Sequence, residues 1–363
     1  MNRMIKPTSL FWPVFILSVI GLFMIYSASS VIATERFLDP YYFLKRQAIF
    51  FGLGCGLMAI FQRVPYQLYK KRAPLLFVLS IILLILVLIP GIGLVRGGAR
   101  SWIGLASFNI QPAEIVKVTL IIYLCYLNEH LVYPVSQLGS GLLFRLVVIL
   151  LSFGLVMLQP DLGTGLIIVG GSVCTLFFQG AKIKHFFSLF ILGLSGLIGL
   201  ILAAPYRIRR LTAFLDPWQD PLGSGFQSIQ SLLAIGPGGI LGTGFLRGKQ
   251  KYFYLPEPHN DFIFAVISEE LGLIGAGLVI GLFMMFFYRG LKLALFVQDN
   301  FAQTLVLGLV TMMTLQVWIN IAVVIGVLPV TGLTLPFLSY GGSSLLINFM
   351  AVGILLNIES NTV

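Results

Sequence analysis

The stretch that decides the fold is the first apolar run, "FWPVFILSVIGLFMIYSASSVIA" at residues 11–33. It carries no charge and is long enough to cross a bilayer core, which takes about 20 helical residues. Similar runs, such as Leu75 to Pro90, repeat along the whole chain. Because a backbone in lipid must satisfy its own hydrogen bonds, this pattern predicts an all-α polytopic membrane protein. A transmembrane barrel would need short alternating segments, which the sequence lacks.

The composition agrees with this prediction. Hydrophobic residues make up 58% of the 363 positions and charged residues only 10%, whereas soluble domains carry about 25% charged residues. These values exclude a water-soluble globular domain. The net charge of +10 lies in segments between apolar runs, which favours anionic lipid headgroups or a phosphate-bearing substrate over nucleic acid as partners. The first run is too long for the core of a signal peptide, so we expect it to be retained.

Apolar runs between charged or Pro/Gly-rich breaks predict ten spans in a single membrane domain, residues 1–363. They lie near 11–33, 45–62, 74–91, 112–133, 142–159, 163–181, 185–205, 262–288, 302–327 and 337–357. An even number of spans places both termini on one side of the membrane. On that side, the terminal segment and the short loops hold eleven bases: Arg3, Lys6, Arg63, Lys70, Lys71, Arg72, Arg145, Lys182, Lys184, Arg289 and Lys292. The short loops opposite hold five: Arg36, Lys45, Arg46, Arg96 and Arg100.

This excess of bases predicts cytoplasmic termini. The long loop 206–261 adds six bases on the outside, but long loops largely escape the rule. The segments 91–111 and 206–261 would then face outward, and the stretch from Gln227 to Ile235 could form a short helix in the interface. We therefore expect the catalytic or binding surface on the outer face.

Two polar motifs lie at or inside predicted spans. In "QPAEIVK", Glu114 and Lys117 are three residues apart, so they share a helical face and can pair. Ionisable residues in a span normally face the bundle interior or a water-filled cavity, so this pair either stabilises helix packing or belongs to a substrate site. In "QPDLGTG", Asp161 fits a turn and helix cap, or an outward carboxylate near Asp261.

The outer segments are cationic and rich in glycine. Their bases are Arg96, Arg100, Arg207, Arg209, Arg210, Arg247, Lys249 and Lys251. Arginine suits phosphate because its guanidinium makes two parallel hydrogen bonds, and backbone N–H groups of "GPGGILGTG", residues 236–244, could add to an anion-binding nest. The alternative is that these bases meet lipid headgroups.

The stretch "LPEPHNDFIFAVISEELG", residues 255–272, places Asp261 directly before an apolar run. Either Asp261 caps the following helix, or Asn260 does so and leaves Asp261 facing the outer solvent. Glu269 comes eight residues later, roughly 12 Å further along a continuous helix. There we expect it to hold neighbouring helices through hydrogen bonds.

The same stretch resembles the signature of the SEDS family, the RodA, FtsW and SpoVE membrane proteins of the bacterial cell wall. Three other stretches match in order: "GARSWIGLASFNIQPAEIVK" at 98–117, "QPDLGTG" at 159–165 and "GLTLPFLSYGGSS" at 332–344. The resemblance covers essentially the whole chain and is strongest to the FtsW and SpoVE branch. One departure is Asn260, where many members carry Thr. The resemblance implies ten membrane helices with a long outer loop after the seventh.

The resemblance further implies a peptidoglycan glycosyltransferase of the bacterial cytoplasmic membrane, which polymerises lipid II outside the membrane for cell division. The family's essential aspartate corresponds to Asp261, its loop arginine and tryptophan to Arg100 and Trp102, and its polar fourth-span pair to Glu114 and Lys117. The expected substrate-binding residues are Arg100, Trp102, Glu114, Lys117, Asp161, Arg207, Arg210 and Lys249. The expected structural polar residues are Glu269, Ser339 and Ser343.

In the implied reaction, Asp261 acts either as a general base or as a ligand of Mg or Mn, and no organic cofactor is expected. Arg100 and the bases at 207–210 and 247–251 would hold the pyrophosphate. The resemblance implies a class B penicillin-binding protein and other division proteins as partners. Two alternatives remain: a lipid II flippase, which would use Glu114 and Lys117, and a non-catalytic division scaffold.

Overall fold

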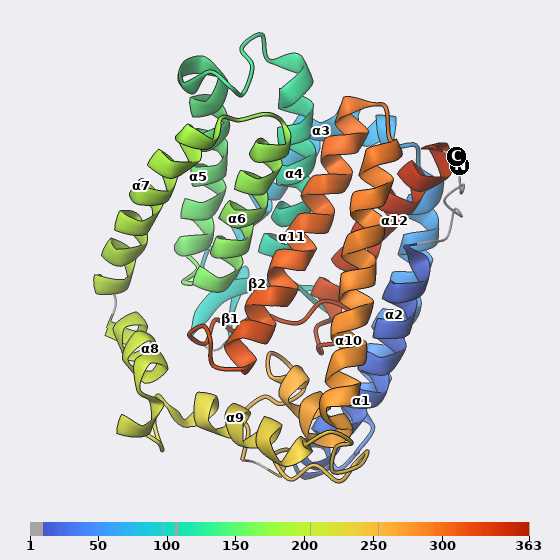
Figure 1. Ribbon diagram of the computed structural model, residues 1–363, viewed down its shortest axis with the longest axis vertical. Helices are drawn as coiled ribbons and strands as arrows, with labels where there is room; N and C mark the ends of the chain where they lie inside the picture. The colour runs from blue at the N-terminus through green and yellow to red at the C-terminus, as the bar shows by residue number, and fades with distance from the viewer. Residues whose placement is uncertain (1–9, 97, 106–107, 204, 253, 363) are drawn as a thin grey trace.

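The computed structural model describes residues 10–96, 98–105, 108–203, 205–252 and 254–362. Each of the ten predicted spans coincides with a helix of a bundle (Figure 1). These helices are α1 (Phe11–Phe37), α2 (Tyr42–Arg63), α3 (Tyr66–Leu86), α4 (Pro112–His130), α5 (Leu143–Met157), α6 (Leu162–Phe178), α7 (Ile183–Leu202), α10 (Ile263–Phe296), α11 (Asn300–Val324) and α12 (Gly342–Thr362). Within the described residues, α1, α2, α10, α11 and α12 have the length and hydropathy of complete spans. The predicted polytopic helical fold is confirmed.

The segment predicted as the first outer loop forms a small antiparallel sheet. Its strands are β1 (Gly93–Arg96), β2 (Ala99–Leu105) and β3 (Phe108–Ile110), in the order β1-β2-β3. Leu94 pairs with Trp102, and Ile103 pairs with Ile110, so large apolar residues support the strands. Gly98 has a positive φ of 82° in the turn between β1 and β2, a conformation that costs glycine little. The sheet adds a rigid element to the helical bundle.

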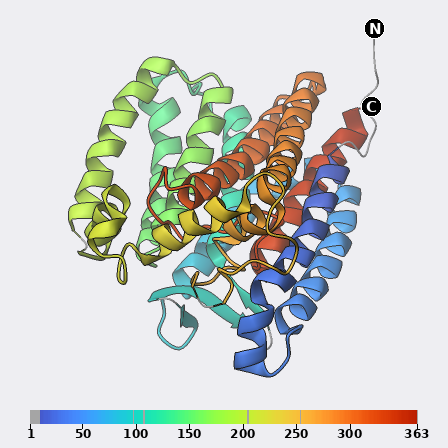
Figure 2. The same ribbon diagram turned by 60° about the horizontal axis from the view of Figure 1, so that its bottom comes forward.

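The long loop after α7 contains three further helical pieces: α8 (Pro205–Leu215), the single turn η2 (Pro217–Gln219) and α9 (Phe226–Gly238). The predicted short helix at 227–235 is confirmed as α9. Figure 2 brings this end of the molecule forward and shows α9 crossing the end of the bundle, with α7 and α8 at its edge. A helical turn, η1 (Leu138–Leu142), lies between α4 and α5 at the other end.

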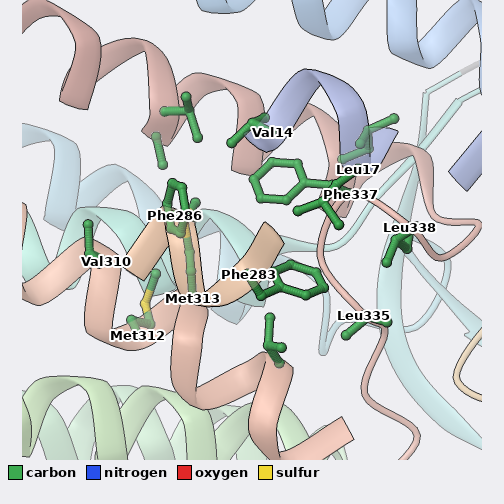
Figure 3. Packing of buried hydrophobic residues seen from close by; sticks show 14 of the residues in the cluster. Val14, Leu17, Phe283, Phe286, Val310, Met312, Met313, Leu335, Phe337 and Leu338 are labelled. Carbon is green, nitrogen blue, oxygen red and sulfur yellow. The ribbon is translucent and has the colours of Figure 1, made fainter. Parts of the chain in front are cut away.

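The segment that joins α11 to α12, residues 325–341, folds into the core. Phe337 and Leu338 are buried beside Val14 and Leu17 of α1, and Phe283 of α10 lies close by (Figure 3). A Cβ on Gly21 of α1 would stand 2.8 Å from the carbonyl oxygen of Phe337, so a glycine is required for this close approach. The packing fixes the path of a loop that lies next to the predicted site.

The helix that follows Asp261 is not continuous. Gly272 interrupts α10 with φ 64° and ψ −162°, which is a conformation that favours glycine. On either side of it the outer loop binds the exposed helix ends: the Thr243 N–H donates to the Glu269 carbonyl over 2.9 Å, and the Leu273 N–H donates to the Gly239 carbonyl over 2.9 Å. The span predicted at 262–288 is therefore interrupted, and Glu269 lies on the uninterrupted part before Gly272.

Candidate functional site

Asp261 does not cap the helix that follows it. The N-cap residue of α10 is Phe262, and its side chain makes no capping hydrogen bond. Asn260 lies two residues before this position, and its amide donates through Nδ2 to Glu257 Oε2 over 2.7 Å. Both capping interpretations are wrong, and the Asp261 carboxylate is left available for another role.

The surroundings of Asp261 favour its protonated form. The residue keeps part of its surface exposed, yet protein atoms surround the carboxyl densely. This burial, the largest cause, raises the pKa of Asp261 to about 7; Glu257 raises it further, while the backbone N–H of Asp261 and the charge of Arg210 oppose the rise. A carboxyl with a pKa near neutrality and access to solvent can accept a proton at physiological pH.

The main chain of Asp261 is tied to α11 and to the loop 325–341. The buried Asn320 of α11 donates through Nδ2 to the Asp261 carbonyl over 2.8 Å and to the Leu333 carbonyl over 2.7 Å. Two residues before Asp261, the His259 carbonyl accepts from the Tyr340 N–H over 2.8 Å. The segment 259–261 is therefore clamped along one side.

Glu114 and Lys117 form the predicted pair, with Lys117 Nζ 2.9 Å from Glu114 Oε2, and both side chains are buried. Lys117 also donates to Gln316 Oε1 of α11 over 2.7 Å. Ser344 of α12 donates to Glu114 Oε2 over 3.2 Å, and Gln316 Nε2 donates to the Thr334 carbonyl over 2.8 Å. The pair is thus part of a polar cluster that joins three helices to the loop 325–341.

A cavity of about 640 Å³ brings Asp161 and Arg210 together. Its walls come from the β1–β2 turn, the start of α6, Ile201 of α7, α8 and residues 329–332, and they are largely apolar. Arg210 donates to the Val330 carbonyl over 3.2 Å. The cavity combines an apolar wall with one carboxyl and one guanidinium.

Asp161 takes its predicted role as a helix cap. Its Oδ1 accepts from the Thr164 N–H over 3.0 Å as the N-cap of α6, and its Oδ2 accepts from Gln111 Nε2 over 3.0 Å. Burial raises the pKa of Asp161, and the hydrogen bonds from Thr164 oppose that rise. The charges of Glu114 and Lys117 also act on this carboxyl, so Asp161 lies within electrostatic reach of the buried pair.

Other predicted substrate contacts are placed less closely. Arg100 and Trp102 lie on β2 and are half-buried; Ala99, the neighbour of Arg100, lines the 640 Å³ cavity, but Arg100 and Trp102 do not. The side chain of Arg207 lies outside the described part of the chain. The Lys249 side chain is exposed, and its main-chain N–H donates to Glu269 Oε1 over 2.6 Å.

Two expectations for the long loop are wrong. Lys251 was expected among the pyrophosphate-binding bases, but its Nζ is buried 2.8 Å from Glu270 Oε1. Glu269 was expected to bond neighbouring helices, but its carboxylate accepts from the main-chain N–H groups of Lys249 and Gln250. The physical reason is that residues 243–251 of the outer loop fold back onto α10 and bind both carboxylates.

The two serines of the last motif differ. Ser339 Oγ accepts from the Leu335 N–H over 2.7 Å, and its carbonyl accepts from Gln47 Nε2 of α2 over 3.2 Å, which suits its predicted structural role. Ser343 is buried, and its Oγ has no hydrogen-bond partner among the described residues. No hydrogen bond in this part of the chain therefore supports the structural role predicted for Ser343.

Divalent-cation binding at Asp261 would need oxygen ligands from outside the protein. Across the described ranges, no three His, Cys, Asp or Glu side chains lie together as a metal site. Mg²⁺, however, is commonly held by one or two carboxylates together with substrate phosphates and water. Asp261 with a pyrophosphate fits that mode, whereas a closed protein site for the ion does not form here.

Gln316 and Asn320 are functional candidates that were not predicted from the sequence. They are the two amides of α11 that contact the cluster and Asp261. A signal was present, since both lie four residues apart within an otherwise apolar run, which places them on one helical face. Ser344 was missed for another reason, because a serine close to a pair of glycines is typical of a loop.

Comparison with known proteins places this architecture in a family. The sequence model of the FtsW, RodA and SpoVE family, described as cell cycle protein, matches residues 8–363. Stage V sporulation protein E of Bacillus subtilis is 49% identical, covering 95% of this chain and 94% of that protein. A probable peptidoglycan glycosyltransferase FtsW of Geobacter metallireducens is 43% identical, covering 95% and 92%.

Solved structures agree. A chain from a peptidoglycan synthase complex, solved to explain the coordination of polymerization and crosslinking, has a TM-score of 0.81 at 31% identity and covers 97% of both chains. Rod shape determining protein RodA of Thermus thermophilus has a TM-score of 0.72 at 28% identity, covering 98% of this chain and 96% of that one. The higher identity to SpoVE and FtsW confirms the resemblance to their branch. The chain belongs to the FtsW, RodA and SpoVE family of cell cycle proteins.

Proposed function

We propose that this chain is a peptidoglycan glycosyltransferase that polymerises lipid II into glycan strands at the outer face of the bacterial cytoplasmic membrane, for cell division. Relatives that are 41–47% identical over 93–95% of the chain are named probable peptidoglycan glycosyltransferases. The observation that carries the proposal is Asp261: a partly exposed residue whose carboxyl is not committed to capping and has a pKa of about 7.

Asp261 acts as the general base. It takes the proton of the acceptor sugar hydroxyl while that oxygen bonds to the anomeric carbon of the donor. The bond between this carbon and the pyrophosphate oxygen breaks, and the lipid pyrophosphate leaves with the electron pair. One carboxylate suffices for this single displacement, which inverts the anomeric centre.

Arg210 is the best-placed cation for the leaving pyrophosphate. It lines the cavity, and its charge acts on Asp261, so a phosphate beside it would lie near the base. Developing negative charge is stabilised by such fixed cations. The apolar cavity wall suits the first part of the lipid. Asp161 lines the cavity, and the charges of the Glu114–Lys117 pair act on Asp161. Arg100 and Trp102 remain proposed contacts at the edge of the cavity.

The metal-dependent alternative keeps Asp261 at the centre. Asp261 would be a protein ligand of Mg²⁺ or Mn²⁺, with pyrophosphate oxygens and water as the others. Such an ion would help to neutralise the leaving group. Polymerisation measured with chelator, then with Mg²⁺ or Mn²⁺ restored, separates the two roles: a base alone predicts no loss on chelation.

The orientation and partners follow from the same proposal. The excess of bases in the short loops favours cytoplasmic termini, which puts Asp261, the sheet and α9 on the outer side. The similar chain from a peptidoglycan synthase complex supports a penicillin-binding protein as partner. We extend this to a class B transpeptidase and other division proteins.

The test is lipid II polymerisation by purified protein, alone and with a cognate transpeptidase. Asp261→Asn should abolish glycan product while its folding, judged by size exclusion and melting temperature, is retained. Asp220→Asn, on the exposed outer loop, is the matched control and should polymerise normally. Full activity of Asp261→Asn would refute the proposal.

Vesicles carrying labelled lipid II test the alternatives. Lipid crossing without glycan product would favour a flippase, and neither activity, with transpeptidase binding retained, would favour a scaffold.

A further inference from the structure

Two amide side chains stand one helical turn apart on α11. Gln316 and Asn320 are four residues apart, so they share one face of the helix, and both are buried. Their amide groups bind successive carbonyls of the loop 325–341: Gln316 Nε2 donates to Thr334 over 2.8 Å, and Asn320 Nδ2 donates to Leu333 over 2.7 Å. The loop is therefore held to α11 at two adjacent peptide groups.

Each amide also binds a second element. Lys117 Nζ of α4 donates to Gln316 Oε1 over 2.7 Å, and Asn320 Nδ2 donates to the Asp261 carbonyl over 2.8 Å. The contacts form a chain from the Glu114–Lys117 pair through Gln316, the peptide groups of 333–334 and Asn320 to the main chain of Asp261. Every link is a hydrogen bond or an ion pair between buried or half-buried groups.

The chemistry of the links requires amides. Both oxygens around Asn320 Nδ2 are carbonyl acceptors, so only the NH₂ end can face them, and it supplies one proton to each. A carboxylate there would turn an acceptor toward two acceptors, and an aliphatic side chain would leave two buried carbonyls without that donor. Gln316 needs both groups of its amide: the oxygen accepts from Lys117, and the NH₂ group donates to the Thr334 carbonyl.

We propose that Gln316 and Asn320 are positioning residues that fix the main chain of Asp261 relative to the Glu114–Lys117 pair and the cavity. The proposal rests on the function proposed for Asp261. Neither amide reaches the reacting atoms; each acts by holding the segment that carries the base. Because a misplacement of about 1 Å can lower a rate on the order of 100-fold, a clamp on that segment has a direct effect on turnover.

The positioning also sets the electrostatic surroundings of the base. The charged groups whose fields act on the Asp261 carboxyl are Glu257 and Arg210; the nearby His259 is buried and neutral, with a pKa lowered to about 4 chiefly by burial. Releasing the clamp lets the carboxyl move toward water, and hydration lowers the pKa of a buried acid. The pH dependence of the reaction therefore reports on the clamp.

The experiment compares three variants of the full-length protein in lipid II polymerisation, with its transpeptidase partner present. Asn320→Leu removes both donated bonds. Gln316→Glu keeps the volume and the bond from Lys117 but removes the bond to Thr334. Thr314→Val is the control, because within the described ranges the side chain of Thr314, on the same helix, bonds the Val310 carbonyl of its own turn and no other element.

We expect Asn320→Leu to lower kcat about tenfold or more and to shift the midpoint of the rising limb of the pH–rate profile downward by about half a unit or more. Gln316→Glu should show a smaller loss with a shift in the same direction, and Thr314→Val should match wild type. A merely structural role would scale the rate equally at every pH and leave the midpoint unchanged.

The outcomes separate this inference from the proposed function. Wild-type kcat and midpoint in both amide variants, with Asp261→Asn inactive, would overturn the positioning role and leave the base intact. Activity in Asp261→Asn would overturn the proposed function itself. Should Asn320→Leu fail to fold, Gln316→Glu decides: an unchanged midpoint and kcat in that variant contradict the clamp.

Discussion

Two buried ion pairs occupy different parts of this molecule. Glu114 and Lys117 lie one turn apart on α4, with 2.9 Å between their charged atoms. Lys251 of the outer loop meets Glu270 of α10 over 2.8 Å. The distances are nearly equal and all four side chains are buried, yet the surroundings differ.

The Lys251–Glu270 pair is enclosed by fixed partners. Glu270 accepts from Ser27 of α1 over 2.7 Å and from the main-chain N–H groups of Leu246 and Gly248, so the pair joins α1, α10 and the outer loop as an anchor. The partners of Glu114 and Lys117 are side chains of α11 and α12, and the charges of this pair act on Asp161, which lines the cavity. The neighbours of a buried pair, and not the pair itself, therefore distinguish anchoring from participation in a site.

The largest expected effect comes from breaking the anchor. Lys251→Met leaves Glu270 buried without its counter-charge, which should cost about 3–5 kcal/mol of stability. The yield of monodisperse protein and its melting temperature in detergent measure this. Lys251→Met combined with Glu270→Gln should recover part of the loss, because the orphaned charge is gone. Wild-type melting of the single variant would contradict the anchoring role.

Breaking the other pair should separate activity from stability. Lys117→Met leaves the buried Glu114 with one neutral donor, the Ser344 hydroxyl, so we expect a loss of stability in the same range of about 3–5 kcal/mol. In addition, we expect polymerisation by the protein that remains folded to fall about tenfold or more. Rates corrected for the folded fraction at a temperature well below melting provide the measurement. A loss of activity no larger than the loss of folded protein would make this pair a second anchor.

The buried carboxyl of Asp261 should lower the stability of the folded protein at neutral pH. Its pKa is raised to about 7, above the unfolded value of about 4. The folded state therefore binds more protons between these values, and stability falls as pH rises from about 4 to about 7. Asp261→Asn should raise the melting temperature above pH 7 by about 2–4 °C and leave it unchanged near pH 4. Melting curves across this range check the sign, and a gain confined to low pH would contradict it.

The smallest effect is expected at an exposed pair. Asp39 and Lys45 meet over 2.9 Å, and the side chain of Lys45 is 65% exposed. Water and salt screen such a pair, and ordering two side chains opposes the gain. Asp39→Asn should leave both the melting temperature and polymerisation at wild-type values, which makes it a baseline for the buried pairs. A clear loss of stability or polymerisation would show that Asp39 contributes more than its exposed contact with Lys45.

The local features were predictable from the sequence. The ten apolar runs identified the bundle helices because hydrophobicity over about 20 residues is a property of each segment alone. The pairing of Glu114 with Lys117 followed from helical spacing, and the N-cap role of Asp161 followed from its place before "LGTG". The helix at 227–235 was likewise predicted from its local sequence.

The errors share one cause, which is contact between distant segments. Glu269 was expected to bond neighbouring helices because its partners, the N–H groups of Lys249 and Gln250, come from a loop that folds back onto α10. Lys251 was counted among exposed bases because its partners, Glu270 and Ser27, are 19 and 224 positions away. The roles of Gln316 and Asn320 appear only when α11 meets the loop that follows it.

The bundle character of the protein, the positions of its ten bundle helices and the ionisable group before one of them could be read from the sequence, because these depend on short-range pattern and on the cost of polar groups in lipid. Only the tertiary structure decided that Asp261 is free of capping, that its pKa lies near 7 and that two amides of α11 hold its main chain. Burial and hydrogen-bond partners are set by residues tens to hundreds of positions apart, and no local pattern carries that information.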